Sequence, residues 1–274
     1  MFEEVVGGAK AAESIWEHRA AIAKTVKDLV QLATKGQLIL LSFGAGGTGK
    51  TTLGRLLSGN ISLGEPLPGY DLTLDTETYN VEGSTFVTLY VPPGQESKRA
   101  AHWGGLIDKM SAARRYAVFN VVCWGYHSID TANLSSYPFY RPKMPKEDLL
   151  IALLNDRRAE EIRALKYLEP HLQKAPGKLR LITVVTKQDL WWKHRSSVRQ
   201  HYENGEYQNI LNRIKADKGI GNFTHDYTSA CLNLLNFSSD DGRILKRTAE
   251  GYDSFHWIAN FNRLIRAIRS IVEA

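Results

Sequence analysis

Short apolar segments recur along the chain, and most of them precede a longer segment whose apolar residues repeat every three or four positions. The first pattern predicts strands and the second predicts amphipathic helices. The predicted strands are 38–43, 76–81, 85–91, 116–124, 179–186 and 222–228. The predicted helical segments are 10–35, one beginning near Lys50, a helix or ordered loop over 96–115, then 147–174, a region near 193–217 and a final helix from about Asp253.

The order of these elements predicts the fold class. The strands 76–81 and 85–91 alternate in polarity and are separated by Glu82-Gly83-Ser84, which indicates an antiparallel hairpin. The other strands alternate with helices, which is typical of a parallel sheet. We therefore expect an α/β protein with a mostly parallel six-stranded sheet, one antiparallel strand of the hairpin at its edge and helices on both faces.

The length of 274 residues suits one large domain with additions. We expect a helical extension over 1–36 and one domain over 37–274. Within the domain, 127–148 contains three prolines and no helical or strand period, so it is interpreted as an irregular insertion. The helix of the extension either packs on the domain or docks on a partner or a membrane surface, and the sequence leaves both open.

Composition narrows the class of protein. The hydrophobic share of 43% and the charged share of 23% are typical of a soluble globular protein. A formal net charge of +6 attracts nucleotides, acidic partners and anionic lipids alike, but no basic cluster favours nucleic-acid binding. Cys123 and Cys231 are too few for a disulfide framework. No apolar run reaches the roughly 18 residues of a membrane span, so we expect a cytoplasmic protein with at most peripheral membrane association.

One segment carries a specific chemical pattern, Gly44-Ala45-Gly46-Gly47-Thr48-Gly49-Lys50-Thr51. It lies between a predicted strand and a predicted helix and matches G-x-x-x-x-G-K-[ST], the pattern of a phosphate-binding loop. Glycines let backbone N–H groups approach phosphates closely, and the helix start adds its positive dipole end. We expect this loop and Thr52 to bind a nucleoside polyphosphate, with Lys50 at the β- and γ-phosphates and Thr51 holding Mg²⁺.

Two later segments are candidates for contacting the base of such a nucleotide. Asp189 ends Thr186-Lys187-Gln188-Asp189, directly after a predicted strand, where its carboxylate could accept the ring N–H and amino hydrogens of guanine. The aliphatic stem of Lys187 could cover the base. At the end of the last predicted strand, Ser229-Ala230-Cys231 could offer a backbone N–H, that of Ala230, to the base carbonyl. The alternative is that 186–189 merely ends a strand.

Four segments resemble the G1, G3, G4 and G5 elements of Ras-like small GTPases, within the P-loop GTPase superfamily. In that order they are Gly44 to Thr51, Gly94-Gln95, Thr186 to Asp189 and Ser229-Ala230. The resemblance covers roughly 37–274. It implies the P-loop GTPase fold, binding of GTP or GDP with Mg²⁺, and GTP hydrolysis. It also implies that Gln95 orients the attacking water and that the Gly94 N–H senses the γ-phosphate.

The resemblance also has departures. The G3 aspartate, which supports Mg²⁺ in the family, falls on Val91, and Thr186 stands where the family usually has Asn. A proline before Gly-Gln also occurs in the bacterial GTPases that switch polarity in gliding motility, so this prokaryotic subgroup is the one that we expect. The G2 threonine, a further Mg²⁺ ligand, is expected at Thr73, with Thr76 as the alternative.

The expected function is therefore a guanine-nucleotide switch. With no arginine finger identified in the chain, we expect slow GTP hydrolysis, and we expect 60–80 and 92–112 to change with nucleotide state and contact an effector or regulator. Two alternatives remain open: a P-loop ATPase or kinase, and a GTP-locked scaffold that barely hydrolyses.

The final helix is a further candidate partner surface, with outward Arg263, Arg266 and Arg269 and an inward face of Phe255, Ile258, Leu264, Ile265, Ile268 and Val272. The tryptophans expected to be packed inside are Trp103, Trp191 and Trp192.

Overall fold

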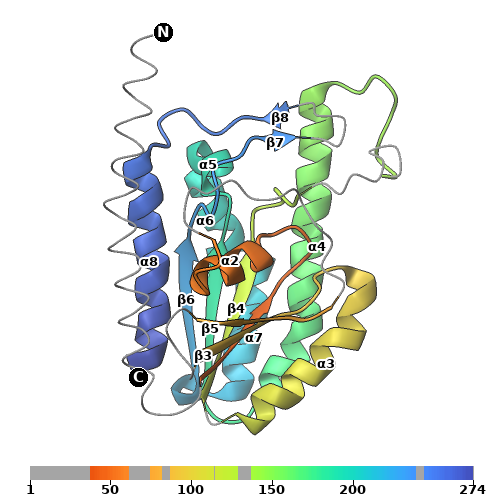
Figure 1. Ribbon diagram of the computed structural model, residues 1–274. Helices are drawn as coiled ribbons and strands as arrows, with labels where there is room; N and C mark the ends of the chain where they lie inside the picture. The colour runs from red at the N-terminus through yellow and green to blue at the C-terminus, as the bar shows by residue number, and fades with distance from the viewer. Residues whose placement is uncertain are drawn as a thin grey trace.

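The computed structural model describes residues 38–61, 75–81, 87–113, 115–128, 137–238 and 244–273 (Figure 1). The strands are β1 (Leu38–Phe43), β2 (Glu77–Asn80), β3 (Val87–Val91), β4 (Arg115–Val122), β5 (Leu179–Val185), β6 (Phe223–Ser229), β7 (Phe237–Ser238) and β8 (Ile244–Lys246). The α-helices are α2 (Lys50–Leu57), α3 (Glu96–Ala112), α4 (Lys146–Lys174), α5 (Gln188–Trp191), α6 (Arg195–Glu203), α7 (Glu206–Lys218) and α8 (Ser254–Glu273). Two 3₁₀ helices are η3 (Trp192–His194) and η4 (Ile220–Asn222). The predicted helix 10–35 and the predicted ligand Thr73 lie outside the described residues.

Six strands form one sheet in the order β2-β3-β1-β4-β5-β6. Every neighbouring pair is parallel except the edge pair β2–β3, which is antiparallel. The predicted fold class is therefore confirmed, including the hairpin strand at the edge. Because parallel strands all end at the same edge, the loops that follow β1, β3, β4, β5 and β6 gather there, at the edge where ligands bind in open α/β sheets.

The central strand β1 shows why the sheet is covered on both faces. Ile39, Leu41 and Phe43 belong to a core cluster with α3, α4, α6 and α7, while Leu38 and Leu40 belong to a second cluster with α2 and α8. All six residues of β1 are buried. Figure 1 shows the same arrangement, with α8 on one side of the sheet and α3, α4 and α7 on the other. An apolar strand without alternation thus reflects burial on both faces.

The inward face of α8 is mostly as predicted, with one correction. Ile258, Leu264, Ile265 and Ile268 are buried, but Phe255 is 74% exposed. At 3.6 residues per turn, position 255 lies roughly 120° around the helix from the middle of the buried stripe, so its ring points away from the sheet. The side chains of Arg269 and Val272 lie outside the described residues.

Local backbone geometry explains the other differences from the predicted elements. The strand predicted over 116–124 ends at Val122 because Trp124 and Gly125 have positive φ, 53° and 84°, and turn the chain. The helical region near 193–217 is divided at Asn204 and Gly205 into α6 and α7. The β7–β8 ribbon was not predicted because its strands are two and three residues long, too short to show an alternating pattern.

Among the described helices, none combines the length and the apolar character needed to span a bilayer.

The three tryptophans bear out the packing prediction to different degrees. Trp103 and Trp191 are buried, with 0% and 3% exposure. Trp192 is half-buried and packs edge-on against Tyr252 and His256, with ring centroids 5.3 and 4.8 Å away.

Candidate functional site

The phosphate loop runs from the end of β1 to the start of α2, at the carboxyl edge of the sheet. Gly44 has φ 137°, and a Cβ at this position would lie 2.1 Å from the Val121 carbonyl oxygen of β4. The loop is therefore pressed against β4 in a way that only glycine permits. Of the nine residues predicted to bind phosphate, the buried ones are Gly44, Ala45, Thr48 and Lys50, and the partly exposed ones are Gly46, Gly47, Gly49, Thr51 and Thr52.

Lys50 begins α2 and lies across the loop. Its ammonium donates to the Ala45 carbonyl oxygen at 2.7 Å and is 6% exposed. Burial, and secondarily the charge of Arg99, lowers the pKa of Lys50 to about 7. An anion beside Nζ would stabilise its charged form, so the position is suited to a phosphate.

Gly94 follows β3 and comes directly against the phosphate loop. A Cβ on Gly94 would lie 2.3 Å from the Lys50 Nζ and 2.6 Å from the Ala45 carbonyl. The Gly94 carbonyl accepts from Arg99 Nε and Nη2, at 3.1 and 2.9 Å. Arg99 is buried and pairs with Glu160 of α4 at 3.1 Å. The structure thus brings together two predicted site residues, Gly94 and Lys50. Arg99 and Glu160 were not predicted, because neither belongs to a motif.

Gln95 is the N-cap residue of α3 and is half-buried. Its Oε1 is buried and has no hydrogen-bond partner within the part of the chain that the structure describes. A buried amide oxygen without a partner is uncommon in folded proteins. It is therefore an acceptor whose hydrogen-bonding capacity the described residues leave unused.

Thr51, the predicted Mg²⁺ ligand, lies beside an unpredicted carboxylate. Its Oγ1 donates to Glu77 Oε2 of β2 at 2.9 Å. Hydroxyl and carboxylate oxygens are hard ligands of the kind that Mg²⁺ prefers, so this pair fits a magnesium site. Val91, at the usual aspartate position, is 0% exposed. Thr76, the alternative to Thr73, directly precedes β2 and is half-buried.

Thr186 and Lys187 tie the end of β5 to the phosphate loop. Thr186 Oγ1 donates to the Thr48 carbonyl at 2.6 Å and to that of Val122 at 3.2 Å. Lys187 adopts a left-handed conformation with φ 54°, and its Nζ donates to the Tyr126 carbonyl at 2.5 Å. In this structure, the side chains of Thr186 and Lys187 therefore both donate hydrogen bonds to backbone carbonyl groups of the protein itself.

Asp189 lies in the short helix α5 and is 1% exposed. Oδ1 accepts from the Cys231 thiol, and Oδ2 accepts from the Thr248 hydroxyl, each at 3.1 Å. Burial raises the pKa of Asp189. A thiol is a weak donor, so a stronger pair of donors would stabilise the carboxylate better. Thr248 is a neighbour that the sequence did not indicate.

The predicted role of Ala230 needs correction. Its N–H, which was expected to meet a base carbonyl, donates to the Val185 carbonyl at 3.0 Å and therefore belongs to the β5–β6 ladder. Ser229 accepts from the Gln188 amide at 2.9 Å. Of the three predicted residues 229–231, Cys231 is the one whose side chain reaches Asp189.

A buried polar cluster supports the loop after β4. Glu161 Oε1 accepts from the Cys123 N–H at 2.8 Å and from His127 Nε2 at 3.0 Å, and Oε2 accepts from the Tyr202 hydroxyl at 2.6 Å. Burial would raise the pKa of Glu161, but these partners outweigh it and the pKa is lowered. Cys123, His127 and Glu161 have the donor types of a metal site, but the carboxylate already has four hydrogen-bond donors, the fourth being the Gly125 N–H. The cluster therefore fixes the turn of residues 123–128, whose Ser128 N–H donates to the Gly47 carbonyl at 3.0 Å.

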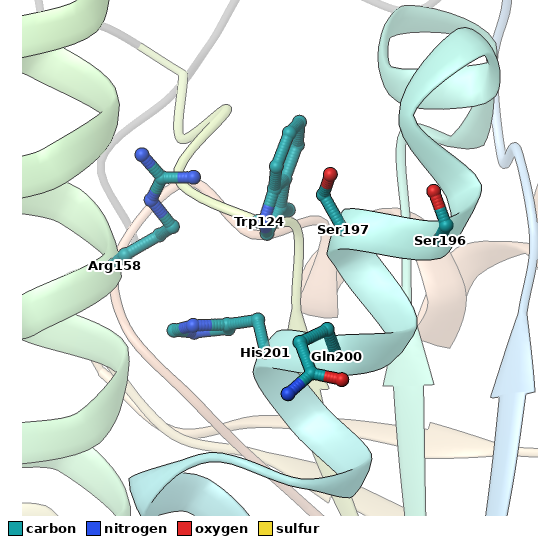
Figure 2. Close-up of a pocket in the computed structure, with 6 residues that line it drawn as sticks. All are labelled: Trp124, Arg158, Ser196, Ser197, Gln200 and His201. Carbon is teal, nitrogen blue, oxygen red and sulfur yellow. The ribbon is translucent and has the colours of Figure 1, made fainter.

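A pocket between α4 and α6 lies apart from the phosphate loop and borders the turn of residues 123–128 at Trp124 (Figure 2). It has a volume of about 590 Å³. Arg158 of α4 lies over the Trp124 ring, with its guanidinium carbon 4.9 Å from the centroid. The remaining lining residues come from α6 and are Ser196, Ser197, Gln200 and His201. No residue of the phosphate loop lines it, so it is not the predicted nucleotide site.

Comparison with known proteins gives likeness of structure only. No protein-family model matches the chain, and no curated protein matches its sequence. Toc33 from Arabidopsis thaliana in complex with GDP and Mg²⁺ is 14% identical over 94% of this chain and 95% of that chain, with a TM-score of 0.48. The ADP ribosylation factor-like GTP binding protein/small COPII coat GTPase SAR1 from Encephalitozoon cuniculi, in complex with GDP, is 13% identical over 98% and 93%, with a TM-score of 0.49. The mammalian SRP receptor is 14% identical over 86% and 99%, with a TM-score of 0.43. At these identities and TM-scores, nothing about the function of this chain follows from them.

Proposed function

We propose that this chain is a guanine-nucleotide-dependent switch that binds GTP and GDP at the phosphate loop and slowly hydrolyses GTP. The observation that carries this proposal is the bond from Thr186 to the Thr48 carbonyl, across 138 residues of sequence. It joins the element expected at the phosphates to the segment that presents Asp189, the residue expected at the base. Two separate motifs are thereby held as one site.

At the phosphate end, the backbone N–H groups of 44–51 surround the polyphosphate and the Lys50 ammonium neutralises its charge. Thr51 and Thr73 hold Mg²⁺, which, when bound, neutralises charge that develops on the phosphate oxygens. Gln95 orients the attacking water through its unpartnered Oε1, and the Gly94 N–H reports the presence of the γ-phosphate. Thr52 adds a further donor at the start of α2.

At the base end, Asp189 accepts the ring N–H and amino hydrogens of guanine, and Lys187 covers one face of the base with its aliphatic stem. The base displaces the weak Cys231 thiol from the carboxylate. Ser229 and Ala230 then shape the site by holding the end of β6 rather than by direct donation. A P-loop ATPase or kinase is the competing function, and Asp189 distinguishes the two.

Titration of GDP, GTP and ATP tests this choice. Because a buried carboxylate without its donors costs about 1–3 kcal/mol, we expect wild type to bind GDP at least about tenfold more tightly than ADP or ATP. Asp189→Asn should remove most of that preference, whereas Asp226→Asn, on the exposed side of β6, should leave it unchanged. Equal affinity of wild type for ATP and GTP would contradict the guanine assignment.

Single-turnover hydrolysis separates a switch from a GTP-locked scaffold. We expect a slow but measurable rate in the wild type, and a decrease of about tenfold or more in Gln95→Leu, because positioned water is the main contribution expected of this residue. A rate that the substitution leaves unchanged would show that Gln95 is not catalytic. No hydrolysis in wild type with tight GTP binding would favour the scaffold.

Other parts of the proposal rest on the sequence. The proline before Gly94-Gln95 favours a prokaryotic GTPase similar to the gliding-motility polarity GTPases. We further propose a cytoplasmic protein whose segments 60–80 and 92–112 contact an effector or regulator, with the extension 1–36 and the insertion near 127–148 as additional partner surfaces. In the described part of that insertion, Tyr137 folds back on α4, where it accepts a hydrogen bond from Arg157.

A further inference from the structure

Glu77 of β2 and Val91 of β3 are directly opposite each other in the antiparallel pair. Opposed residues of such a pair project from the same face, with Cβ atoms about 4.5–5.5 Å apart. Position 91 is where the resemblance calls for a carboxylate that supports Mg²⁺, but Val91 is apolar and fully buried. The carboxylate that β3 lacks is therefore present on the neighbouring strand, at the paired position.

The Glu77 side chain reaches the helix that follows the phosphate loop. Thr51 Oγ1 donates to Glu77 Oε2 at 2.9 Å. Glu77 is one strand farther from the loop than residue 91, and the additional methylene of glutamate relative to aspartate compensates for part of that distance. Both the length of the glutamate side chain and the position of Glu77 on β2 are thus consistent with a contact to Thr51.

Packing fixes the position of this carboxylate from the other side. The Tyr79 hydroxyl donates to the same Oε2 at 2.9 Å. The Tyr79 ring lies against α2 at Gly54, where a Cβ would be 2.6 Å from ring carbons. Glu77 is therefore held between a hydroxyl of α2 and an aromatic residue of its own strand that packs on α2.

We propose that Glu77 supports the Mg²⁺ site at Thr51 and replaces the carboxylate that is missing at position 91. This inference rests on the proposed function, since Mg²⁺ is expected at Thr51 together with a nucleotide. Glu77 is a positioning residue: by accepting the hydrogen bond from Thr51, it would orient the hydroxyl so that its oxygen could serve as a ligand of Mg²⁺. Removal of such a supporting group typically weakens metal affinity about 10–100-fold.

Release of a fluorescent GDP analogue, measured from excess EDTA to millimolar Mg²⁺, tests this role without any hydrolysis. Glu77→Gln should need about tenfold more Mg²⁺ than wild type for half-maximal slowing of release. In excess EDTA the two proteins should release the analogue at the same rate, because the carboxylate acts through the metal. The matched control is Glu147→Gln at the exposed start of α4, which should follow the wild-type curve.

Placing a carboxylate at position 91 of β3 tests directly whether Glu77 replaces the carboxylate that is missing there. The double substitution Glu77→Gln with Val91→Asp should restore most of the wild-type Mg²⁺ dependence. If Glu77→Gln does not fold, Glu77→Asp serves instead: its carboxylate is one methylene short of Thr51, so we expect a smaller shift in the same direction.

Coinciding Mg²⁺ curves for wild type and the Glu77 variant would overturn the inference. So would a faster release that is equally large in EDTA, because it would assign Glu77 to the packing of β2 on α2 alone. A wild-type protein that does not bind the GDP analogue at all would instead refute the proposed function, which keeps the two failures distinguishable.

Discussion

The two sides of the phosphate loop are built in different ways. The base-side wall, residues 186–189 with 229–231, is buried except at Lys187 and Ser229, and it is bonded to the backbone of other elements, as Thr186 is to Thr48 and Val122. The switch-side wall, residues 77, 91, 94, 95 and 99, meets the loop through the Glu77 carboxylate at Thr51 and through the backbone of Gly94, and it includes a buried amide oxygen of Gln95 without a partner among the described residues. Such a difference suits the proposed switch, in which one side would hold the ligand while the other would respond to the γ-phosphate.

The difference also appears in the charges of the two walls. Lys187 on the base-side wall is half-buried, and desolvation lowers its pKa, but its Nζ has backbone and hydroxyl acceptors at fixed positions. On the switch-side wall, Arg99 connects the Gly94 carbonyl to Glu160 of α4. The base-side wall is thus anchored mainly to neighbouring strand ends, whereas the switch-side wall is anchored to helices, to α4 through the Arg99–Glu160 ion pair and to α2 through Glu77 and Thr51. Four substitutions or conditions probe this contrast.

Lys50→Ala should have the largest effect, because the Lys50 ammonium lies in the phosphate loop, beside the Ala45 carbonyl and Gly94. Charge-assisted hydrogen bonds contribute about 1.5–3 kcal/mol each, so the loss of contacts to the β- and γ-phosphates should weaken GTP binding by about 4 kcal/mol, or roughly a thousandfold. GDP binding, which loses the β-phosphate contact alone, should weaken by about 2 kcal/mol. Calorimetric titration measures this, and circular dichroism checks the fold. Retention of wild-type affinity in Lys50→Ala would contradict the proposed nucleotide binding at the phosphate loop.

Arg99→Gln should act on the switch-side wall alone. Removal of one partner of a buried ion pair costs about 3 kcal/mol, although Glu160 keeps its contacts with Arg157 and His127. We expect a loss of unfolding free energy of that order and a smaller difference between GTP and GDP affinity, with GDP affinity itself nearly unchanged. Urea unfolding and nucleotide titration measure the two quantities. A large loss of GDP affinity would show that the walls are not separable.

Contiguous segments could be expected from the sequence, whereas isolated residues could not. The phosphate loop, Gly94-Gln95 and residues 186–189 each combine specific residue types after a recognisable strand. Glu77 and Arg99 could not be predicted, because their partners lie 26 and 61 residues away and a single polar residue carries no local period. The Ala230 prediction was wrong because it depended on the β5–β6 register: Val185 pairs with Ser229, which places the Ala230 N–H in the ladder.

Acid should destabilise the sheet beneath the base-side wall. His225 of β6 bonds to the Thr183 hydroxyl of β5 at 2.9 Å, and burial lowers the pKa of His225 to about 4. Because the unfolded chain takes up the proton at a pKa near 6.5, the stability that this residue contributes is complete above that pH and is lost as the pH falls towards 4. The loss should be about 2 kcal/mol at pH 5. Urea unfolding at pH 7 and pH 5 should show this slope in wild type and a shallower one in His225→Gln; equal slopes would contradict the assignment.

Thr186→Val should have the smallest effect and separates the walls most cleanly. The substitution keeps the shape of the side chain but removes the donor to the Thr48 and Val122 carbonyls, at a cost of about 1–3 kcal/mol. Because this hydroxyl holds the loop to the base-side wall, we expect GDP release about tenfold faster, with the Mg²⁺ dependence of release retained. Thr224→Val, on the exposed face of β6, is the control. Unchanged GDP release with altered GTP hydrolysis would reverse the roles of the two walls, since the loop would then be held from the switch side.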